Sequence, residues 1–239
     1  MISETITSLV THGATELNIE LPPEAVAAFE TYYEFLEKRR QNVNLTAIYG
    51  EEEVANLHFL DSIALLNITE FKSKRVIDIG SGAGFPGVPL LIAEPTIDLT
   101  LLDAAGKRIA FLTELCARLN VTSTYIKARA EEAAHIPGNR ELYDIVLSRA
   151  VAQLNILCEL CIPFVRVGGL FIAMKSVDSA KEIDEANSAV ESLGAEFIKH
   201  VDYTIPGTKI IHRAVVIQKK TNTKSNFPRR YSKIKKSPL

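Results

Sequence analysis

Cysteine is scarce in this sequence, and its distribution leaves little room for metal chemistry. The chain has three cysteines, an odd number, and Cys158 and Cys161 form a single C-E-L-C motif. A zinc site of this type needs a second such pair, which the chain lacks, so no metal ion is expected. A lone pair at this spacing also occurs in redox proteins, but the surrounding segment LNILCELCIPFV is apolar, which favours two thiols packed in a buried helix.

Long apolar runs are also absent. No stretch approaches the roughly 18 apolar residues of a membrane-spanning helix, and the basic start and apolar middle of a secretory signal are missing. We therefore expect a protein that neither spans a membrane nor is secreted, with a cytoplasmic location. The 239 residues, of which 47% are apolar and 23% charged, are typical of a globular chain with one α/β domain and an appendage.

Acidic residues are missing from the last part of the chain. All 29 aspartates and glutamates lie at or before Asp202, whereas ten of the 27 lysines and arginines follow it. The first 202 residues therefore carry 17 basic groups against 29 acidic ones, a net charge of −12, and the remainder carries +10. Ten cations without an anion, interrupted by Phe227, Pro228 and Tyr231, favour a nucleic-acid contact over a merely solvated terminus.

The strongest local pattern is the stretch RVIDIGSGAGFPG, residues 75–87. Its first five residues form an apolar run with β-branched side chains, which predicts a buried strand that stops at a glycine cluster. Gly80, Gly82 and Gly84 alternate with small residues, so the backbone can adopt positive φ and a ligand can approach the main chain. Pro86 suits the first turn of a helix, whose free N–H groups we expect to face the same ligand.

Two cofactor classes use a loop of this kind. Read from Gly82, GAGFPG fits the dinucleotide pattern G-x-G-x-x-G, with Asp103 about 20 residues further on. Read from Asp78, DIGSGAG places a carboxylate where it can accept a hydrogen bond from the ammonium group of S-adenosylmethionine, whereas a pyrophosphate would be repelled. The alternative for Asp78 is a turn-capping role. Asp103 suits the hydroxyls of a ribose, which both cofactors have.

From residue 71 to 220, strand patterns alternate with helical ones, which predicts a mostly parallel sheet of seven strands covered on both faces. Residues 1–70 are expected to form a helical region packed on that domain, and residues 221–239 a basic tail. Ligands should lie at the carboxyl ends of the strands. Ala130 and Glu131 follow the third strand and Arg149 the fourth. The alternatives are a helix-starting acidic residue for Glu131 and a surface position for Arg149.

A third N-terminal helix is predicted from Glu51 to Leu66. It contains His58 and Asp61, which are three residues apart and therefore share one face. Polar residues on a shared face suit either a catalytic pair or a connection to the neighbouring domain. We interpret this pair as a polar bridge between the helical region and the core domain.

Several motifs taken together resemble one family. They are NVNLTAI, HFLDS, VIDIGSGAGFPGVPL, LLDAAGKRIAFL, ARAEE, DIVLSRAVA and GGLFIAMK, followed by a basic end with FPRR and KKSPL. From about Glu24 to the C-terminus the chain is similar to the bacterial 16S ribosomal RNA guanine-N7 methyltransferases, also called the glucose-inhibited division protein B family. One departure is visible, because the family usually has Trp-Asn where this chain has Arg39-Arg40.

The resemblance implies a Rossmann-like class I methyltransferase fold with an added helical N-terminus. It also implies S-adenosylmethionine as methyl donor and a guanine of 16S ribosomal RNA as acceptor. Guanine N7 has a lone pair and no proton, so no catalytic residue is expected. The expected cofactor-binding residues are Gly80, Phe85, Ala130, Glu131 and Arg149 from the family's motifs, together with Asp78, Gly82 and Asp103 from the loop and strand ends.

The expected partner is 16S ribosomal RNA or the small-subunit particle. The basic residues expected to reach it are Arg229, Arg230, Lys233, Lys235 and Lys236, and the expected state is a monomer. Two alternatives remain open. A nicotinamide-dependent Rossmann oxidoreductase accounts for the glycine loop alone, and a non-catalytic RNA-binding protein accounts for the basic end alone.

Overall fold

The centre of the structure is a seven-stranded sheet. The structure, a computed structural model, describes residues 5–40, 45–149 and 152–239, without the side chain of Arg40. The order across the sheet is β3-β2-β1-β4-β5-β7-β6; the first five strands are parallel, and β7 runs antiparallel to both of its neighbours. The strands are β1 (Arg75–Ile79), β2 (Asp98–Asp103), β3 (Thr124–Lys127), β4 (Tyr143–Arg149), β5 (Val165–Ser176), β6 (Ala195–Thr204) and β7 (Ile211–Lys219).

Helical segments precede, connect and cover the strands. Before the sheet come α1 (Ile6–Glu16), α2 (Ala25–Arg40) and a continuous stretch made of α3 (Glu51–Val54), a π-helical turn (Ala55–Leu60), α4 (Asp61–Ile63) and a 3₁₀ turn (Ala64–Asn67). After β1 come α5 (Gly87–Ala93), α6 (Gly106–Arg118), α7 (Ala130–Ala133), α8 (Leu154–Cys161) with a 3₁₀ turn (Ile162–Phe164), α9 (Ala180–Glu185), α10 (Asn187–Ser192) and α11 (Tyr231–Lys236).

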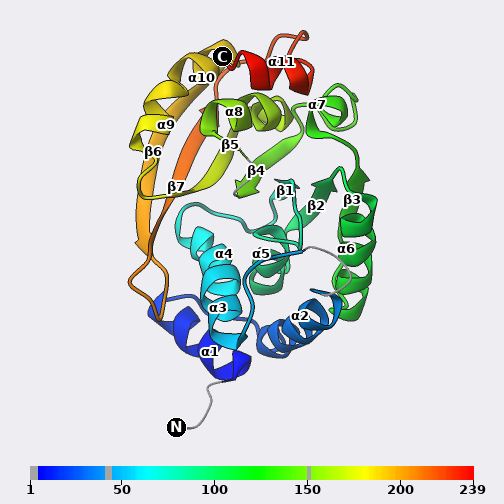
Figure 1. The fold of residues 1–239 in the computed structure, drawn as a ribbon, viewed down its shortest axis with the longest axis vertical. Helices are drawn as coiled ribbons and strands as arrows, with labels where there is room; N and C mark the ends of the chain where they lie inside the picture. Colours follow the sequence, from blue (N-terminus) through cyan, green and yellow to red (C-terminus); the bar gives the residue numbers. More distant parts are fainter. Residues whose placement is uncertain (1–4, 41–44, 150–151) are drawn as a thin grey trace.

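Alternating side chains of the strands point into two separate apolar cores. Val76 and Leu101 belong to the core shared with the N-terminal helices, α5 and α6. Ile77 and Leu102 belong to the core shared with α7, α8 and α10. Figure 1 shows these two helical layers on opposite sides of the sheet. Because both faces of the central strands are buried, their sequences are nearly continuous apolar runs, as parallel sheets require.

The N-terminal helical region shares one apolar core with the sheet. The rings of Phe29 and Tyr32 pack on Phe59, with centroids 4.9 and 5.2 Å apart, and Tyr32 stacks on Phe85 of the glycine loop at 5.3 Å. The Tyr32 hydroxyl donates a hydrogen bond to the carbonyl oxygen of Ala83 at 2.5 Å. The helical region therefore supports the glycine loop directly.

The seven strands predicted from the sequence are confirmed, with β7 as the antiparallel one. The helical segment between β5 and β6 is divided into α9 and α10. The division lies at Ala186, whose N–H is shared between two carbonyl oxygens of the preceding turn, as at many helix ends. Cys158 and Cys161 are buried in α8, as the apolar surroundings predict.

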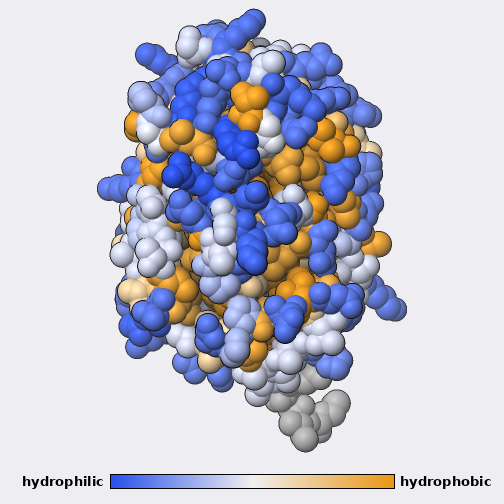
Figure 2. Space-filling model, turned by 180° about the vertical axis from the view of Figure 1, so that it is seen from behind, coloured by the Kyte–Doolittle hydropathy of each residue, from blue (hydrophilic) through white to orange (hydrophobic). Residues whose placement is uncertain are grey.

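On the side seen in Figure 2, apolar side chains form patches among hydrophilic ones. Exposed apolar residues such as Ile136, Val167 and Ile198 are ordinary for a folded chain. Across the described ranges, no helix has both the length and the apolar character needed to cross a membrane.

Gly84 provides a test of how tightly the glycine loop is packed. Its φ is +105°, and a Cβ there would lie 2.6 Å from the Tyr32 hydroxyl oxygen and 2.9 Å from a Val88 methyl group. We expect Gly84→Ala to lower the free energy of unfolding by about 2 kcal/mol or more, measured by urea denaturation. Gly138→Ala, in an exposed turn with no described atom within 4 Å of the new methyl, should change it by less than about 0.5 kcal/mol. Equal effects would contradict the close packing.

Candidate functional site

A buried carboxylate stands where β1 ends and the glycine loop begins. Asp78 is fully buried, and its Oδ2 accepts a hydrogen bond from the Gly87 N–H at 3.0 Å. From the sequence, the first N–H of α5 was expected to face a ligand. In the structure it donates its hydrogen bond to Asp78 instead. The other oxygen, Oδ1, has no hydrogen-bond partner among the described residues. Burial raises the pKa of Asp78 to about 7. A buried oxygen without a donor is costly unless a ligand supplies one.

The glycine loop is tied to the end of β2. Gly80 and Ser81 both donate backbone hydrogen bonds to the Leu102 carbonyl, at 2.8 and 3.1 Å, and Gly82 donates to Asp103 Oδ2 at 3.1 Å. Gly80 and Gly82 have φ values of +75° and +58°, a region that L-residues with side chains rarely adopt. A Cβ added to Gly82 would meet only the Gly80 carbonyl, at 3.8 Å, so the loop borders open space here.

A hollow of about 180 Å³ opens beside this loop, at the carboxyl ends of β1, β2 and β3. Its place agrees with the rule that ligands of parallel α/β sheets bind at the carboxyl ends of the strands. It is smaller than the usual ligand pocket of about 300–1,000 Å³. Its lining includes four predicted site residues, Gly80, Asp103, Ala130 and Glu131. It also includes Arg108, Arg129, Leu160 and Tyr231.

The two acidic residues of the hollow are held by nearby donors. Asp103 accepts hydrogen bonds from the Ala105 N–H at 2.8 Å and from Arg108 Nη1 at 3.3 Å. Glu131 lies in the first turn of α7, so it does begin a helix, and it accepts from Arg129 Nε at 2.6 Å. These carboxylates are only 4% and 9% exposed. A ligand that binds there must exchange hydrogen bonds with these donors.

A larger hollow, of about 650 Å³, lies elsewhere. It is lined by α2 and by the ends of α5 and α6, among them Thr31, Pro95 and Asn120. It also reaches Asp98, which begins β2, so it lies toward the amino ends of the strands. None of the predicted site residues lines it. We therefore place the site at the smaller hollow, on its chemistry and its position in the sheet.

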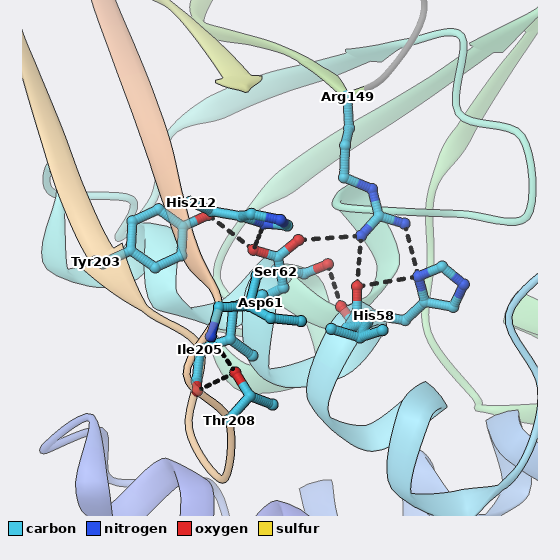
Figure 3. A network of polar contacts seen from close by, with 10 residues as sticks. His58, Asp61, Ser62, Arg149, Tyr203, Ile205, Thr208 and His212 are labelled. Carbon is cyan, nitrogen blue, oxygen red and sulfur yellow. Dashed lines mark hydrogen bonds and ion pairs between the residues drawn. The ribbon is translucent and has the colours of Figure 1, made fainter. Parts of the chain in front are cut away.

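Arg149 joins the sheet to the N-terminal helical region (Figure 3). At the end of β4, its Nη1 donates to the Leu57 carbonyl at 3.1 Å and to Asp61 Oδ2 at 3.3 Å, and its Nη2 lies 2.9 Å from His58 Nδ1. The guanidinium is 5.0 Å from the centre of the Phe85 ring. The predicted polar bridge of His58 and Asp61 is confirmed, and Arg149 is the residue on the core domain that it meets.

Asp61 also has two hydrogen-bond partners on β6 and β7, at the far edge of the sheet. Its Oδ1 accepts from the hydroxyl of Tyr203 on β6 at 2.8 Å and lies 2.9 Å from Nδ1 of His212 on β7. Figure 3 shows both side chains directed at the carboxylate from the side opposite Arg149. The Asp61 side chain is 1% exposed. Burial and the neighbouring Asp61 raise the pKa of Tyr203, which keeps it a hydrogen-bond donor.

His58 is a neutral structural residue. Burial and the adjacent Arg149 lower its pKa to about 3. Because a guanidinium can only donate, Nδ1 of His58 accepts from Arg149, and Nε2 carries the hydrogen that it donates to Thr46 Oγ1 at 2.8 Å. The Phe85 ring is 5% exposed and stacks on His58, with centroids 4.2 Å apart. Phe85 therefore packs among aromatic residues, and its contact with a cofactor stays a prediction.

Carboxylates from distant parts of the chain neutralise several of the cations that follow Asp202. Arg229 pairs with Glu159, with Nη2 to Oε2 at 2.6 Å, and Lys219 pairs with Glu141 at 3.1 Å. The charge count along the sequence therefore overstates the free positive charge, and Arg229 is not free to bind a phosphate. Among the cations after Asp202, the exposed ones that make no ion pair with any described residue are Lys209, Lys224, Arg230, Lys233, Lys235 and Lys236.

Several residues that line the hollow are not among the expected site residues, including Arg129, Leu160 and Tyr231. Arg129 immediately precedes the predicted Ala130, and its position after a strand was a usable signal. Leu160 reaches the hollow from α8, and Tyr231 reaches it as the first residue of α11. These two arrive through tertiary packing, for which the local sequence contains no signal.

Comparison of sequences identifies relatives over almost the whole chain. Residues 25–209 match the family model described as rRNA small subunit methyltransferase G. A protein named ribosomal RNA small subunit methyltransferase G from Alkaliphilus oremlandii is 41% identical, over 97% of this chain and 98% of its own length. One of the same name from Caldanaerobacter subterraneus subsp. tengcongensis is 42% identical, over 97% of each chain.

Comparison of structures bears on the fold. A methyltransferase from Pyrococcus furiosus superposes with a TM-score of 0.57 at 12% identity, over 80% of this chain and 97% of that one. P. horikoshii TYW2, solved in complex with MeSAdo, gives a TM-score of 0.53 at 10% identity, over 67% of this chain and 62% of that one. The predicted Rossmann-like class I methyltransferase fold is confirmed.

The ion pair between Arg149 and Asp61 can be tested by a double-mutant cycle. Arg149→Met leaves the buried Asp61 without its charged partner, so the free energy of unfolding should fall by about 3 kcal/mol or more in urea denaturation. Adding Asp61→Asn should recover part of this loss, with a coupling of about 1 kcal/mol or more. Arg166→Met breaks a half-exposed pair with Asp144 and should cost less than about 1 kcal/mol. Strict additivity at Arg149 and Asp61 would refute the bridge.

Proposed function

The chain belongs to the rRNA small subunit methyltransferase G family, and we propose that it holds S-adenosylmethionine in the hollow beside the glycine loop. Its activity is the transfer of a methyl group from that cofactor to N7 of a guanine in 16S ribosomal RNA of the small ribosomal subunit. The observation that carries this function is the family match over residues 25–209, which includes every expected cofactor-binding residue. Neither a nicotinamide-dependent oxidoreductase nor a non-catalytic RNA-binding protein is supported by that match.

The residues that line the hollow, together with the buried Asp78 that precedes the lining residue Ile79, fit S-adenosylmethionine. The orphaned Oδ1 of Asp78 would accept a hydrogen bond from the ammonium group at the methionine end. Asp103 would accept from the ribose hydroxyls, in exchange for its present bonds to the loop and to Arg108. Ala130 and Glu131 line the same hollow and suit the base. A dinucleotide would instead place a pyrophosphate close to the ionised form of Asp78, which is unfavourable.

The chain contributes alignment rather than proton transfer. When bound, the cofactor supplies a methyl group activated by its own sulfonium charge. The protein must hold the donor and acceptor in line and exclude water. Because guanine N7 has a free lone pair, no general base is needed. His58 agrees with this requirement, since both of its ring nitrogens are engaged, with Arg149 and Thr46. Arg149 and Phe85, packed on one another, stay in the proposed cofactor site.

We assign the RNA contact to the exposed end of α11 and the residue before it. Lys233, Lys235 and Lys236 lie in the last turn of α11, and Arg230 precedes the helix. Arg229 is left out because Glu159 holds its guanidinium. A ribosomal substrate places the protein with the ribosomes, in the cytoplasm. The expected monomeric state stays a prediction.

The function is tested by methyl transfer from labelled S-adenosylmethionine. The purified protein is incubated with naked 16S ribosomal RNA and with small subunits from cells that lack this chain, and the modified nucleoside is identified by mass spectrometry. We expect 7-methylguanosine in one of these substrates. Transfer to an exocyclic amine or to a ribose hydroxyl would contradict the assignment of N7.

The raised pKa of Asp78 predicts a pH dependence of cofactor binding. Asp78 titrates at about 7, so it is protonated at lower pH and can no longer pair with an ammonium group. Between pH 7.5 and pH 6, where most of the cofactor amine is protonated, affinity measured by calorimetry should fall roughly six-fold, in proportion to the ionised fraction of Asp78 and the protonated fraction of the amine. The single-turnover rate at saturating cofactor should stay flat, because no titrating group takes part in the chemical step.

A matched pair of variants isolates this effect. Asp78→Asn should lower affinity at pH 7.5 by about 10- to 100-fold, as expected for a charged hydrogen bond, and should abolish the pH dependence. Asp98 is exposed, so Asp98→Asn should change neither the affinity at pH 7.5 nor its pH dependence. An unaltered pH dependence in Asp78→Asn would remove Asp78 from the site.

The proposed RNA contact predicts a change in salt dependence. Replacing Lys233, Lys235 and Lys236 with alanine should weaken RNA binding and reduce the slope of log affinity against log salt by about 2. Cofactor affinity should not change. The control replaces three exposed lysines elsewhere, Lys38, Lys72 and Lys181, with the same change in net charge. If both triple variants have the same slope, the effect comes from net charge alone and the assignment fails.

A further inference from the structure

Beyond the residues assigned so far, we propose that Tyr231 belongs to the cofactor site and contacts the adenine ring of S-adenosylmethionine. Residues 221–239, expected from the sequence to be a basic tail, are folded onto the core and bring this side chain to the hollow. They lie beyond the residues matched by the family model. The inference rests on the proposed function, because it names a further contact with the same cofactor.

A buried carboxylate determines where this C-terminal segment docks. Glu159 of α8 is fully buried, and it accepts hydrogen bonds from the backbone N–H and Nε of Arg229, both at 2.8 Å, and from Nη2 at 2.6 Å. Without Arg229, Glu159 would be an uncompensated charge in an apolar core, which is strongly unfavourable. The position of residue 229 is thus specified, and Tyr231 follows two residues later.

Further contacts hold the segment along its length. The guanidinium of Arg140 donates to the carbonyl oxygens of Thr223 and Phe227, at 2.8 and 2.9 Å. Nε2 of His135 lies 2.8 Å from the carbonyl oxygen of Pro228. Side chains from the segment between α7 and β4 therefore satisfy the backbone of residues 223–228 at several points, which is typical of an integral part of a fold rather than of a solvated tail.

Tyr231 forms a continuous surface with Arg129, which precedes α7, and with Glu131 in the first turn of α7. The guanidinium of Arg129 lies 4.8 Å from the centre of the Tyr231 ring, and its Nε donates to Glu131 at 2.6 Å. Ile234, one turn further along α11, is fully buried and fixes the helix. Aromatic rings and arginine planes are the groups on which nucleobases stack in proteins. This surface is therefore suited to a flat purine.

An RNA base is the other planar ligand that Tyr231 could meet. Tyr231 lines the hollow together with Gly80 and Asp103, the residues that hold the proposed cofactor. The exposed lysines of α11 that we assign to RNA do not line that hollow in the described structure. This separation favours the adenine of the cofactor over a base of the substrate.

The test compares Tyr231→Ala with Tyr231→Phe and with Ser232→Ala, an exposed residue of the same helix. Binding of S-adenosylmethionine and of adenosine is measured by calorimetry, and thermal unfolding verifies that each variant is folded. Tyr231→Ala should weaken both ligands by about the same factor, roughly ten-fold, as expected for loss of one stacking contact. Tyr231→Phe and Ser232→Ala should bind like the parent protein. In turnover, KM for S-adenosylmethionine should rise while kcat stays nearly constant.

The outcomes separate this inference from the function on which it rests. If the parent protein does not bind S-adenosylmethionine, the proposed function fails. If the parent binds it and folded Tyr231→Ala binds it equally well, only the role of Tyr231 is overturned. If Tyr231→Ala keeps cofactor affinity but loses RNA affinity, the ring contacts the substrate instead. A second measurement is amide hydrogen exchange of residues 231–236, which S-adenosylmethionine should slow in the parent protein and not in Tyr231→Ala.

Discussion

The structure depends on the burial of Asp61 against Arg149. A carboxylate that is 1% exposed must be compensated, and the guanidinium at the end of β4 supplies the charge. The same guanidinium covers the Phe85 ring of the glycine loop and binds the carbonyl of Leu57 in the helical region. One side chain thus places the central strands, the loop and the N-terminal helices relative to one another. A change at any of these points alters a contact of Arg149.

The sheet, Asp78 and the glycine loop could be predicted from the sequence because those features are local. The central strands are buried on both faces, so their residues form short apolar runs that are recognisable one at a time. Asp78 and the glycine loop are contiguous in the chain, and their spacing alone indicates a turn open to a ligand. The rule that ligands bind at the carboxyl ends of strands then drew attention to Asp103, Ala130 and Glu131, the last two also expected from the family's motifs, and all three line the hollow.

The remainder could not be predicted because it depends on pairs that are distant in sequence. Glu159 and Arg229 are 70 residues apart, and no pattern around either residue indicates the other. A count of charges after Asp202 therefore assigned Arg229 to RNA, although the fold uses it to anchor the chain. Tyr231 was missed for the same reason, since only the docking of its segment brings it to the hollow. Phe85 illustrates a further limit, because the sequence cannot distinguish a ring that meets a ligand from one that packs on His58.

The partners of Asp61 also have a consequence for how the chain folds. Arg149, Tyr203 and His212 follow it in sequence by 88, 142 and 151 residues. Until β6 and β7 have paired with the sheet, Oδ1 of this aspartate lacks both of its donors, and burying it is unfavourable. The N-terminal helices therefore cannot complete their packing early, even though they are synthesised first. Closing such long loops is entropically costly, which makes the joining of the two ends of the chain a late and slow step.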